Sequence, residues 1–369
     1  MKIAVFHELP LGGARRVAND FSKELKKRHQ IDGYIVGSEK NAMEKECYTK
    51  MYFYKFITKN WSGHNWKAKL YKDTFELYNL YKLHKKIAAD IDKKKYDVVI
   101  VHPSKFTQAP FVLRFLMTNK IYYAHEAYRI MYEEHFRIRN SGNLLKDLYE
   151  FLSRKIKKTI DATNLANAPT IFVNSENTKR NIFRFYSRKS TICYPGIDTA
   201  FFKLQKVKKA IDVLFIGSTT DNTDGFFDLK NAIDIIKKKI KLEVVGGGEK
   251  WIDDKRLRLL YAQSKMVFCG AHNEPFGLIP LEAILSGSYV VALNEGGYKE
   301  TYIKGKTILV ERKTEAIANA IQKVLKRKSP HINSTMNTRI WSLTVRTKML
   351  ESEIKNALKI RKNFRKTDK

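Results

Sequence analysis

Two carboxylates lie in one short segment, HNEPFGLIPLEAILSG, at residues 272–287. Glu274 precedes a helical pattern and Glu282 falls inside it, with seven residues between the two. A carboxylate beside a helix start accepts hydrogen bonds from hydroxyl groups, and the first backbone amides of the helix attract an anion such as a phosphate. A second carboxylate further along suits the vicinal hydroxyls of a ribose. The alternative is an ordinary amphipathic helix with two incidental glutamates, which leaves the prolines and glycine in step with them unexplained.

The elements around this segment alternate between short apolar strands and amphipathic helices. One series of strands ends near residue 194, and a second begins at Asp212. The basic stretch 203–209 lacks an apolar pattern and is predicted to be a linker. Two such series indicate two doubly wound, mostly parallel sheets. The predicted strands cover residues 3–6, 32–36, 97–101, 120–124, 170–173, 191–194, 212–216, 241–245, 266–269 and 289–293.

Glycine loops and a histidine follow several of these strands. They are Gly12-Gly13, His125, Gly217, residues 246–248 and Gly296-Gly297. Ligands of doubly wound sheets bind at the carboxyl ends of the strands, where these residues fall. Two sheets with facing carboxyl edges would place the ligand in a cleft between two domains.

The same stretches match a known family. The matching residues are 12–16, 173–179, 194–198, Phe202, 274–283, Gly287, 290–292, 296–300 and Trp341-Ser342. In these stretches the chain resembles the family 4 retaining glycosyltransferases of the GT-B fold. The resemblance covers nearly the whole chain apart from residues 48–86 and the last few residues. It implies an α/β protein with two Rossmann-like, doubly wound parallel-sheet domains that face each other across a cleft.

The resemblance also implies a division of labour along the chain. Residues 1–200 would form an acceptor-binding domain and residues 210–345 a nucleotide-sugar-binding domain. Residues 346–369 would form a helix that packs back toward the N-terminal domain. The implied reaction moves a sugar, with retention, from a nucleotide-activated donor to a hydroxyl of a glycan or lipid-linked acceptor. No cofactor and no metal are implied.

The family's site residues carry over onto matching positions. Glu274 would hold hydroxyls of the transferred sugar, Glu282 would bind the ribose, and His125 would contact the donor sugar. A strand-end histidine bonded to backbone is the alternative for His125, and a plain turn is the alternative for residues 246–248. The implied donor-binding residues are Gly12, Gly13, Arg16, Gly217, Ser218, Gly247, Phe276, Gly277, Leu278 and Glu282.

Two positions depart from the family pattern. The family places an arginine where Ser218 stands and a lysine where Asp224 stands, and those two cations neutralise the donor diphosphate. Arg15, Arg16 and Lys230 are alternative cations, among which the sequence does not choose. A different donor would also account for the departure, and so would an inactive sugar- or nucleotide-binding relative of the same fold.

The charge of the chain points to an anionic partner. Its 369 residues include 70 Lys and Arg against 38 Asp and Glu, a formal net charge of +32. Residues 48–86 interleave lysines with aromatic residues, and residues 144–158 form a basic helix pattern, which together suit an anionic membrane surface. Core aromatics with solvated lysines are the alternative. Nucleic-acid binding would also suit the charge, but no binding motif accompanies it.

The remaining sequence features concern the location of the protein. Cys47, Cys193 and Cys269 are three and lie far apart, which disfavours a disulfide framework or a zinc site. The N-terminal apolar run is too short for a signal peptide, and no apolar stretch reaches the roughly 18 residues of a membrane span. A cytoplasmic protein, peripheral at the inner face of a membrane, is therefore expected.

Overall fold

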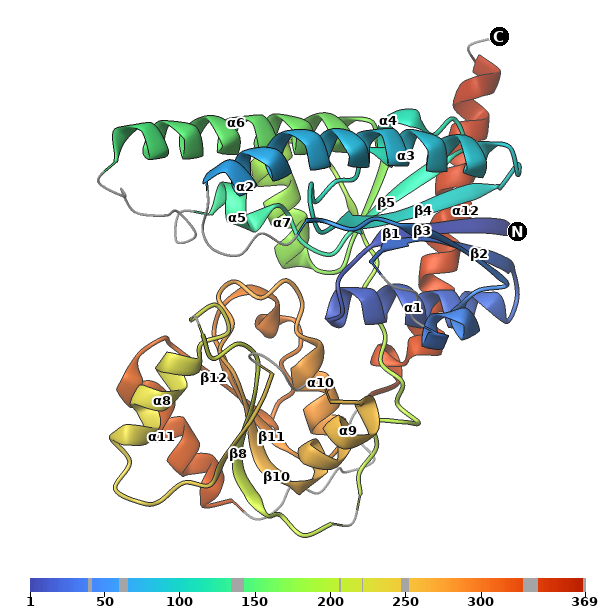
Figure 1. The fold of residues 1–369 in the computed structure, drawn as a ribbon. Helices are drawn as coiled ribbons and strands as arrows, with labels where there is room; N and C mark the ends of the chain where they lie inside the picture. Colours follow the sequence, from blue (N-terminus) through green and yellow to red (C-terminus); the bar gives the residue numbers. More distant parts are fainter. Residues whose placement is uncertain are drawn as a thin grey trace. The chain divides into compact units, whose positions relative to one another are not determined.

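The computed structural model describes residues 1–38, 42–59, 66–133, 143–205, 207–220, 222–246, 252–327 and 338–367. The chain divides into two compact units (Figure 1). The first comprises Met1–Asn174, Thr178–Pro195 and Thr347–Lys369, and the second comprises Ser175–Asn177 and Gly196–Arg346. Within the described residues, the first unit holds a seven-stranded sheet and the second a five-stranded sheet. All strand pairs within these two sheets are parallel, which confirms the predicted α/β class.

The sheet of the first unit has the strand order β3-β2-β1-β4-β5-β6-β7. Its central strands are buried on both faces and therefore read as continuous apolar runs rather than alternating ones. The strands are β1 Lys2–Glu8, β2 Gln30–Gly37, β3 Lys50–Lys55, β4 Val98–Ser104, β5 Lys120–Ala124, β6 Thr170–Val173 and β7 Thr191–Ile192. Strand β3 was not predicted, because its residues read as part of an aromatic and lysine-rich surface. Its Tyr52 and Tyr54 instead pack against the hydrophobic core.

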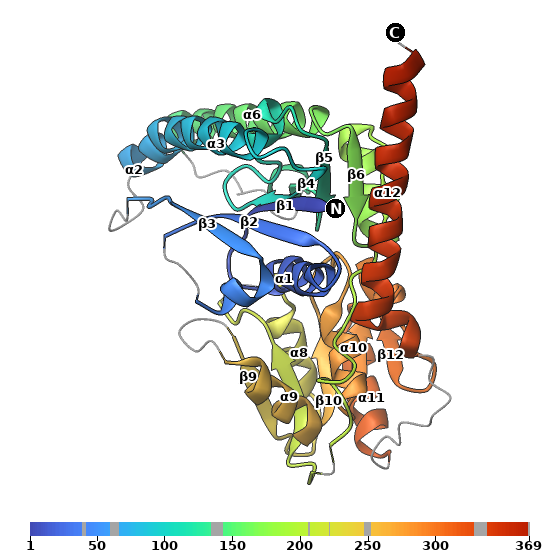
Figure 2. The same ribbon diagram turned by 90° about the vertical axis from the view of Figure 1, so that its right-hand side faces the viewer.

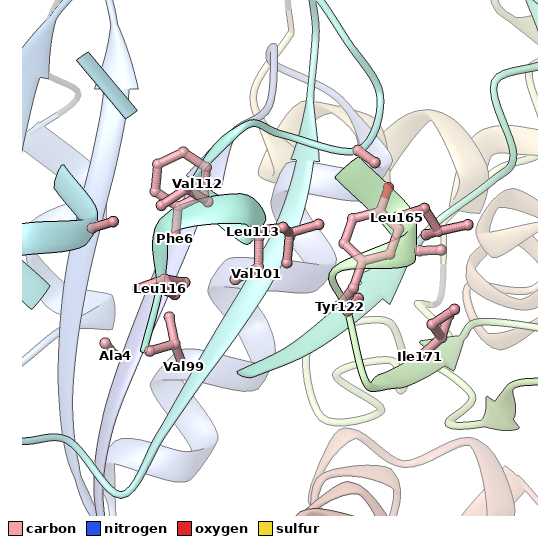
Figure 3. Close-up of a cluster of buried hydrophobic side chains, with 14 of the residues drawn as sticks. Ala4, Phe6, Val99, Val101, Val112, Leu113, Leu116, Tyr122, Leu165 and Ile171 are labelled. Carbon is pink, nitrogen blue, oxygen red and sulfur yellow. The ribbon is translucent and has the colours of Figure 1, made fainter. Parts of the chain in front are cut away.

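Helices cover both faces of this sheet. In Figures 1 and 2, α3 and α6 run side by side over one face, and α1 lies on the opposite face. Figure 3 shows the apolar cluster under α3, α4 and α6, in which Phe6, Val101 and Tyr122 meet Leu113 and Leu165. The helices of the first unit are α1 Gly13–Lys26, α2 Trp66–Tyr71, α3 Leu77–Asp92, α4 Val112–Phe115, α5 Arg129–Tyr132, α6 Leu144–Ala166 and α7 Glu176–Tyr186.

The C-terminal helix α12, Leu343–Thr367, joins the first unit from Thr347 onward. Leu350 and Ile354 are buried there. Glu351 of α12 accepts hydrogen bonds from Lys355 and from Arg28, at 2.7 Å and 3.0 Å. These cations lower the pKa of Glu351 to about 2.

The sheet of the second unit has the order β12-β11-β10-β8-β9. Helices α8 and α11 pack together, and α9 packs with α10 (Figure 1). Strand β12 was not predicted, since its four residues follow a polar turn and make only a short apolar run. The elements are β8 Ile211–Ile216, α8 Phe226–Asp234, β9 Leu242–Val245, α9 Asp254–Gln263, β10 Ser264–Cys269, α10 Leu278–Leu285, β11 Tyr289–Leu293, β12 Thr307–Val310 and α11 Thr314–Leu325.

Candidate functional site

The loop that carries Glu274 connects β10 to α10 in the second unit. Helix α10 begins at Leu278, and its N-cap Gly277 has a φ of 94° and no capping side chain. The first amides of the helix therefore project from a turn with no carboxylate or hydroxyl of its own at the cap. This is the arrangement that makes a helix start an anion site. Phe276, Gly277 and Leu278, all predicted from the sequence, lie together at this start.

Two glycines after β11 hold the Glu274 loop in place. The Gly297 amide donates a hydrogen bond to the Glu274 carbonyl at 2.7 Å. A Cβ on Gly296 would lie 2.6 Å from the Glu274 backbone nitrogen, and one on Gly297 would lie 2.5 Å from the Phe276 Cα. The two glycines thus let one backbone rest directly on another. The position of the Glu274 backbone is set by this contact.

Tyr298 is a buried tyrosine near the Glu274 loop, and two carboxylates affect the pKa of its hydroxyl. The tyrosine is buried, and burial together with the nearby Glu274, Cys269 and Asp224 raises the pKa of its hydroxyl well above its usual value. The Ala271 amide donates to the Tyr298 hydroxyl at 3.3 Å. Glu274 and Asp224 therefore both act on one buried ring. The structure brings these two carboxylates into one neighbourhood.

Glu282 lies within α10 and is only 2% exposed. The hydroxyl of Tyr261, itself fully buried on α9, donates to Glu282 Oε2 at 3.0 Å. An incidental glutamate on an amphipathic helix would point to solvent, because a buried carboxylate carries a large desolvation cost. The burial and the tyrosine partner therefore disfavour an incidental glutamate at position 282. Tyr261 was not singled out in the sequence, since a helical tyrosine normally signals core packing.

The turn after β8 contains the two positions that lack the family's cations. The Ser218 amide donates to Asp224 Oδ2 at 2.6 Å, and the Ser218 hydroxyl lies 3.0 Å from Thr220 Oγ1. A Cβ on Gly217 would lie 2.6 Å from the Asp224 Cβ, so the glycine permits this close approach. Asp224 thus closes the turn from within. Gly246 lies against Gly217, whereas the predicted Gly247 lies outside the described residues.

The predicted glycines of the first unit lie at the start of α1. Gly12 is the N-cap, and a Cβ built on it would meet nothing within 4 Å. Gly13 and Arg16 belong to the first turn of the helix. Arg15 forms a bidentate ion pair with Glu44, because its Nε and Nη2 donate to the two carboxylate oxygens at 2.5 Å and 2.7 Å. Burial raises the pKa of Glu44, but Arg15, His7 and Asn19 together outweigh it and lower that pKa below its usual value.

His125 directly follows β5 and pairs with a second histidine. Its Nε2 lies 3.0 Å from Nδ1 of His102, which lies near the end of β4, and the two rings stack. Burial lowers the pKa of His125 to about 3 and that of His102 well below its usual value. Both rings are therefore neutral near pH 7, and the hydrogen between them fixes a tautomer. The Nε2 of His125 thus faces another side chain and not the backbone.

A further polar cluster lies beside this histidine pair. Glu8, at the end of β1, accepts a hydrogen bond from Ser104, and burial raises the pKa of Glu8 to about 8. His7 and His84 are fully buried, and within the described part of the chain their ring nitrogens have no hydrogen-bond partner. Burial lowers the pKa of His7 to about 4 and that of His84 to about 3. The sequence pattern gave no sign of this cluster.

Two parallel α/β units, with glycine loops and an uncapped helix start at their strand ends, define a GT-B-type glycosyltransferase. Residues 11–201 match the sequence profile described as Glycosyltransferase Family 4, and residues 199–339 match the profile Glycosyl transferases group 1. The first match spans more than half of the chain. The chain therefore belongs to the family 4 glycosyltransferases, a retaining family, and uses a nucleotide sugar.

Two curated relatives illustrate the range of similarity. An uncharacterized 41.2 kDa protein in the cps region of Klebsiella pneumoniae is 24% identical over 339 residues, which cover 83% of this chain and 85% of that protein. The α-1,3/1,6-mannosyltransferase alg-2 of Neurospora crassa is 43% identical over 49 residues, which cover 13% of this chain and 10% of that protein.

Solved structures share the fold at low sequence identity. HepE of Anabaena, in complex with UDP and glucose, aligns with a TM-score of 0.63 and 14% identity over 100% of this chain and 99% of that one. Sucrose-phosphate synthase of Thermosynechococcus elongatus aligns with a TM-score of 0.63 and 14% identity, over 99% and 98% of the two chains. WaaG, a glycosyltransferase involved in lipopolysaccharide biosynthesis, aligns with a TM-score of 0.57 and 13% identity, over 88% and 90%.

Proposed function

We propose that the chain transfers a hexose, with retention of configuration, from a nucleoside diphosphate sugar to a hydroxyl of a glycan or lipid-linked acceptor. The observation that carries this proposal is the Glu274 loop, which the Gly296-Gly297 turn fixes immediately before the uncapped start of α10. A fixed carboxylate beside a set of outward-facing amides suits a ligand with sugar hydroxyls at one end and phosphates next to them. HepE, which binds UDP and glucose, makes a uridine nucleotide the first donor to test.

Each predicted site residue receives a role in this proposal. Glu274 accepts hydrogen bonds from hydroxyls of the transferred sugar, and Glu282 binds the ribose from its place beside Tyr261. The amides of residues 276–278 face the diphosphate. The second unit is then the nucleotide-sugar-binding domain and the first is the acceptor-binding domain.

The first unit supplies the remaining predicted groups. Gly12 and Gly13 leave the start of α1 open to a phosphate, since no atom fills the space where a Cβ on Gly12 would stand. Neutral His125 offers a ring nitrogen to a sugar hydroxyl, with its tautomer set by His102. Arg16, in the first turn of α1 a few residues after Gly12 and Gly13, is the cation proposed to meet the donor.

The proposed reaction breaks the bond between the anomeric carbon and a phosphate oxygen. The acceptor oxygen forms its bond to the anomeric carbon on the same face, and the acceptor's proton passes to the departing phosphate. Helix-start amides stabilise the negative charge that develops on that phosphate. The proposed reaction needs no metal ion, because the helix-start amides and the acceptor's proton together neutralise the charge on the departing phosphate.

A donor panel followed by a turnover assay tests the proposal. Thermal unfolding with UDP, GDP and ADP sugars should show selective stabilisation by one of them, since a ligand that binds the folded state raises its stability. Release of nucleoside diphosphate with acceptor present should fall about 100-fold in Glu274→Gln. Glu315→Gln, at an exposed position of α11, is the matched control and should keep full turnover.

The rival functions give different results in the same assays. Stabilisation by a nucleotide sugar without any release of nucleotide would favour an inactive sugar-binding relative, the alternative that Ser218 and Asp224 raise. No stabilisation by any nucleotide, together with salt-sensitive retention of RNA or DNA on filters, would favour a nucleic-acid-binding protein. Wild-type turnover in Glu274→Gln would refute the site itself.

The proposed location is cytoplasmic and peripheral at a membrane. Among the described helices, none combines the length and apolar character that crossing a membrane requires. A lipid-linked acceptor would hold its reactive hydroxyl close to a headgroup surface, so an enzyme that docks there would meet it at high local concentration.

A further inference from the structure

Helix α6 exposes its apolar side chains instead of burying them. Its outward-facing large apolar residues are Leu144, Leu145, Leu148, Phe151, Leu152 and Ile156, which are 88%, 80%, 54%, 64%, 47% and 56% exposed. We call these six residues the α6 stripe. Their spacing places them along one side of the helix over its first half. A surface helix of a globular protein normally shows the opposite arrangement.

Polar contacts hold the same half of α6 against the protein. Asp73 accepts hydrogen bonds from Tyr149 and Ser153 at 3.0 Å and 2.7 Å, and pairs with Lys157 at 2.7 Å. Glu150 pairs with Lys69 of α2. Burial opposes the ionisation of Asp73, but these contacts outweigh it and lower the pKa of Asp73 below its usual value. The first half of α6 is thus amphipathic with its apolar side turned outward.

The second half of the helix has the ordinary arrangement. Asp161, Asn164 and Leu165 are buried, and Asn164 and Asp161 bond the backbone of Ala109 at 2.7 Å and 2.9 Å. Thr163 is exposed. The inversion is therefore confined to the stripe and is not a property of the whole helix.

The charged residues around the α6 stripe indicate the kind of partner that it would contact. Lys155 is exposed among the stripe residues, and Lys67 and Lys72 are exposed on the neighbouring helical segment. Of the acids near the stripe, Asp73 and Glu150 pair with lysines on the protein side, and Asp147 lies in the first turn of α6. The net charge of +32 opposes pairing with a second copy of this chain through this surface. An apolar stripe bordered by cations fits an anionic lipid surface.

We propose that the α6 stripe inserts into the interface of an anionic membrane while its flanking lysines bind the headgroups. Figures 1 and 2 show α6 at the margin of the first unit, alongside α3. This inference deepens the proposed function, because it names the surface through which the first unit would reach a lipid-linked acceptor. It can be tested without any acceptor.

Vesicle flotation tests the inference directly. Wild-type protein should float with phosphatidylcholine vesicles that contain phosphatidylglycerol and remain at the bottom with phosphatidylcholine alone. The variant L148S/F151S/L152S should lose at least about tenfold in partitioning, because three side chains no longer enter the interface. A matched control, M117S/I235S/I360S, removes three exposed apolar side chains elsewhere and should float like wild type.

Two further measurements separate the outcomes. All variants should unfold at the wild-type temperature. With a soluble acceptor present, they should release nucleoside diphosphate from the donor at the wild-type rate, so a failure of the proposed reaction is seen apart from a failure of docking. Equal flotation of the stripe variant and wild type would overturn the inference, and so would an absence of wild-type flotation. A wild-type dimer that the stripe variant converts to monomer would also overturn it, by showing that a second copy covers the stripe.

Discussion

Replacing Gly297 with alanine should disable the site through the backbone alone. The new Cβ would lie 2.5 Å from the Phe276 Cα, 2.6 Å from its carbonyl oxygen and 2.7 Å from its nitrogen. No flexible side chain can move aside, so the loop must retreat by roughly 0.9 Å before an ordinary contact is restored. A displacement of about 1 Å in a positioning group costs up to about 100-fold in rate. We therefore expect the kcat of Gly297→Ala to fall about 10- to 100-fold.

The stability cost must be separated from this positional effect. Overpacking at Gly297 should lower the free energy of unfolding by about 1–3 kcal/mol. Gly305→Ala is the matched control, because Gly305 has a φ of 79° but open space around its would-be Cβ. That variant should lose a similar amount, about 1–2 kcal/mol, through backbone strain and keep wild-type kcat. Urea unfolding and initial rates of nucleotide release measure both quantities. Unchanged kcat in Gly297→Ala, or equal losses of kcat in both variants, would refute the reasoning.

Three further predictions concern buried polar groups. Burial lowers the pKa of His84 to about 3. Below about pH 6.5 the unfolded chain therefore binds a proton at this histidine that the folded protein does not bind. The free energy of unfolding then falls by about 1.4 kcal/mol for each pH unit between about pH 6.5 and pH 3. His84→Leu should therefore stabilise the protein by about 2 kcal/mol more at pH 5 than at pH 8 in urea titrations, and equal shifts would contradict this. Tyr261→Phe removes the hydrogen bond to Glu282. This variant should bind the nucleotide about 10-fold more weakly in calorimetry, with little change in kcat. An unchanged affinity would show that Glu282 does not bind the ribose. Arg15→Met should lower the free energy of unfolding by about 3 kcal/mol, because it leaves the buried Glu44 carboxylate without its arginine. Adding Glu44→Gln should restore much of the lost stability. If the double variant is no more stable than Arg15→Met, the result would point to a role for Arg15 in the site.

The sequence predicted the fold best where burial is complete. Strands such as β5 and β11 are apolar on both faces, and their bounds agree with the predicted ranges of 120–124 and 289–293. Strand β3 escaped prediction because an edge strand is only half covered, so tyrosines and lysines mix along it as they would on a surface. The inversion of α6 could not be predicted either. Periodicity shows that a helix has an apolar side, but not which way that side turns.

The candidate site could be predicted to the extent that one continuous segment of the sequence forms it. Glu274, Gly277 and Glu282 occupy one continuous segment, and the structure keeps them on one loop and helix. Partners that come from other elements were not predictable. Tyr261 reaches Glu282 from α9, and His102 reaches His125 from a neighbouring strand. Only the packed sheet and its helices bring such residues together.

The Ser218–Asp224 hydrogen bond changes how the missing cations should be understood. The Asp224 carboxylate accepts a hydrogen bond from the Ser218 amide at 2.6 Å and lies against Gly217. Asp224 therefore closes the turn, and its carboxylate also acts on Tyr298. A diphosphate beside that charge needs its stabilisation from elsewhere. The N-cap of α10 makes no side-chain hydrogen bond, and we propose that the fixed dipole of this helix start, together with Arg16, takes the place of the two missing cations.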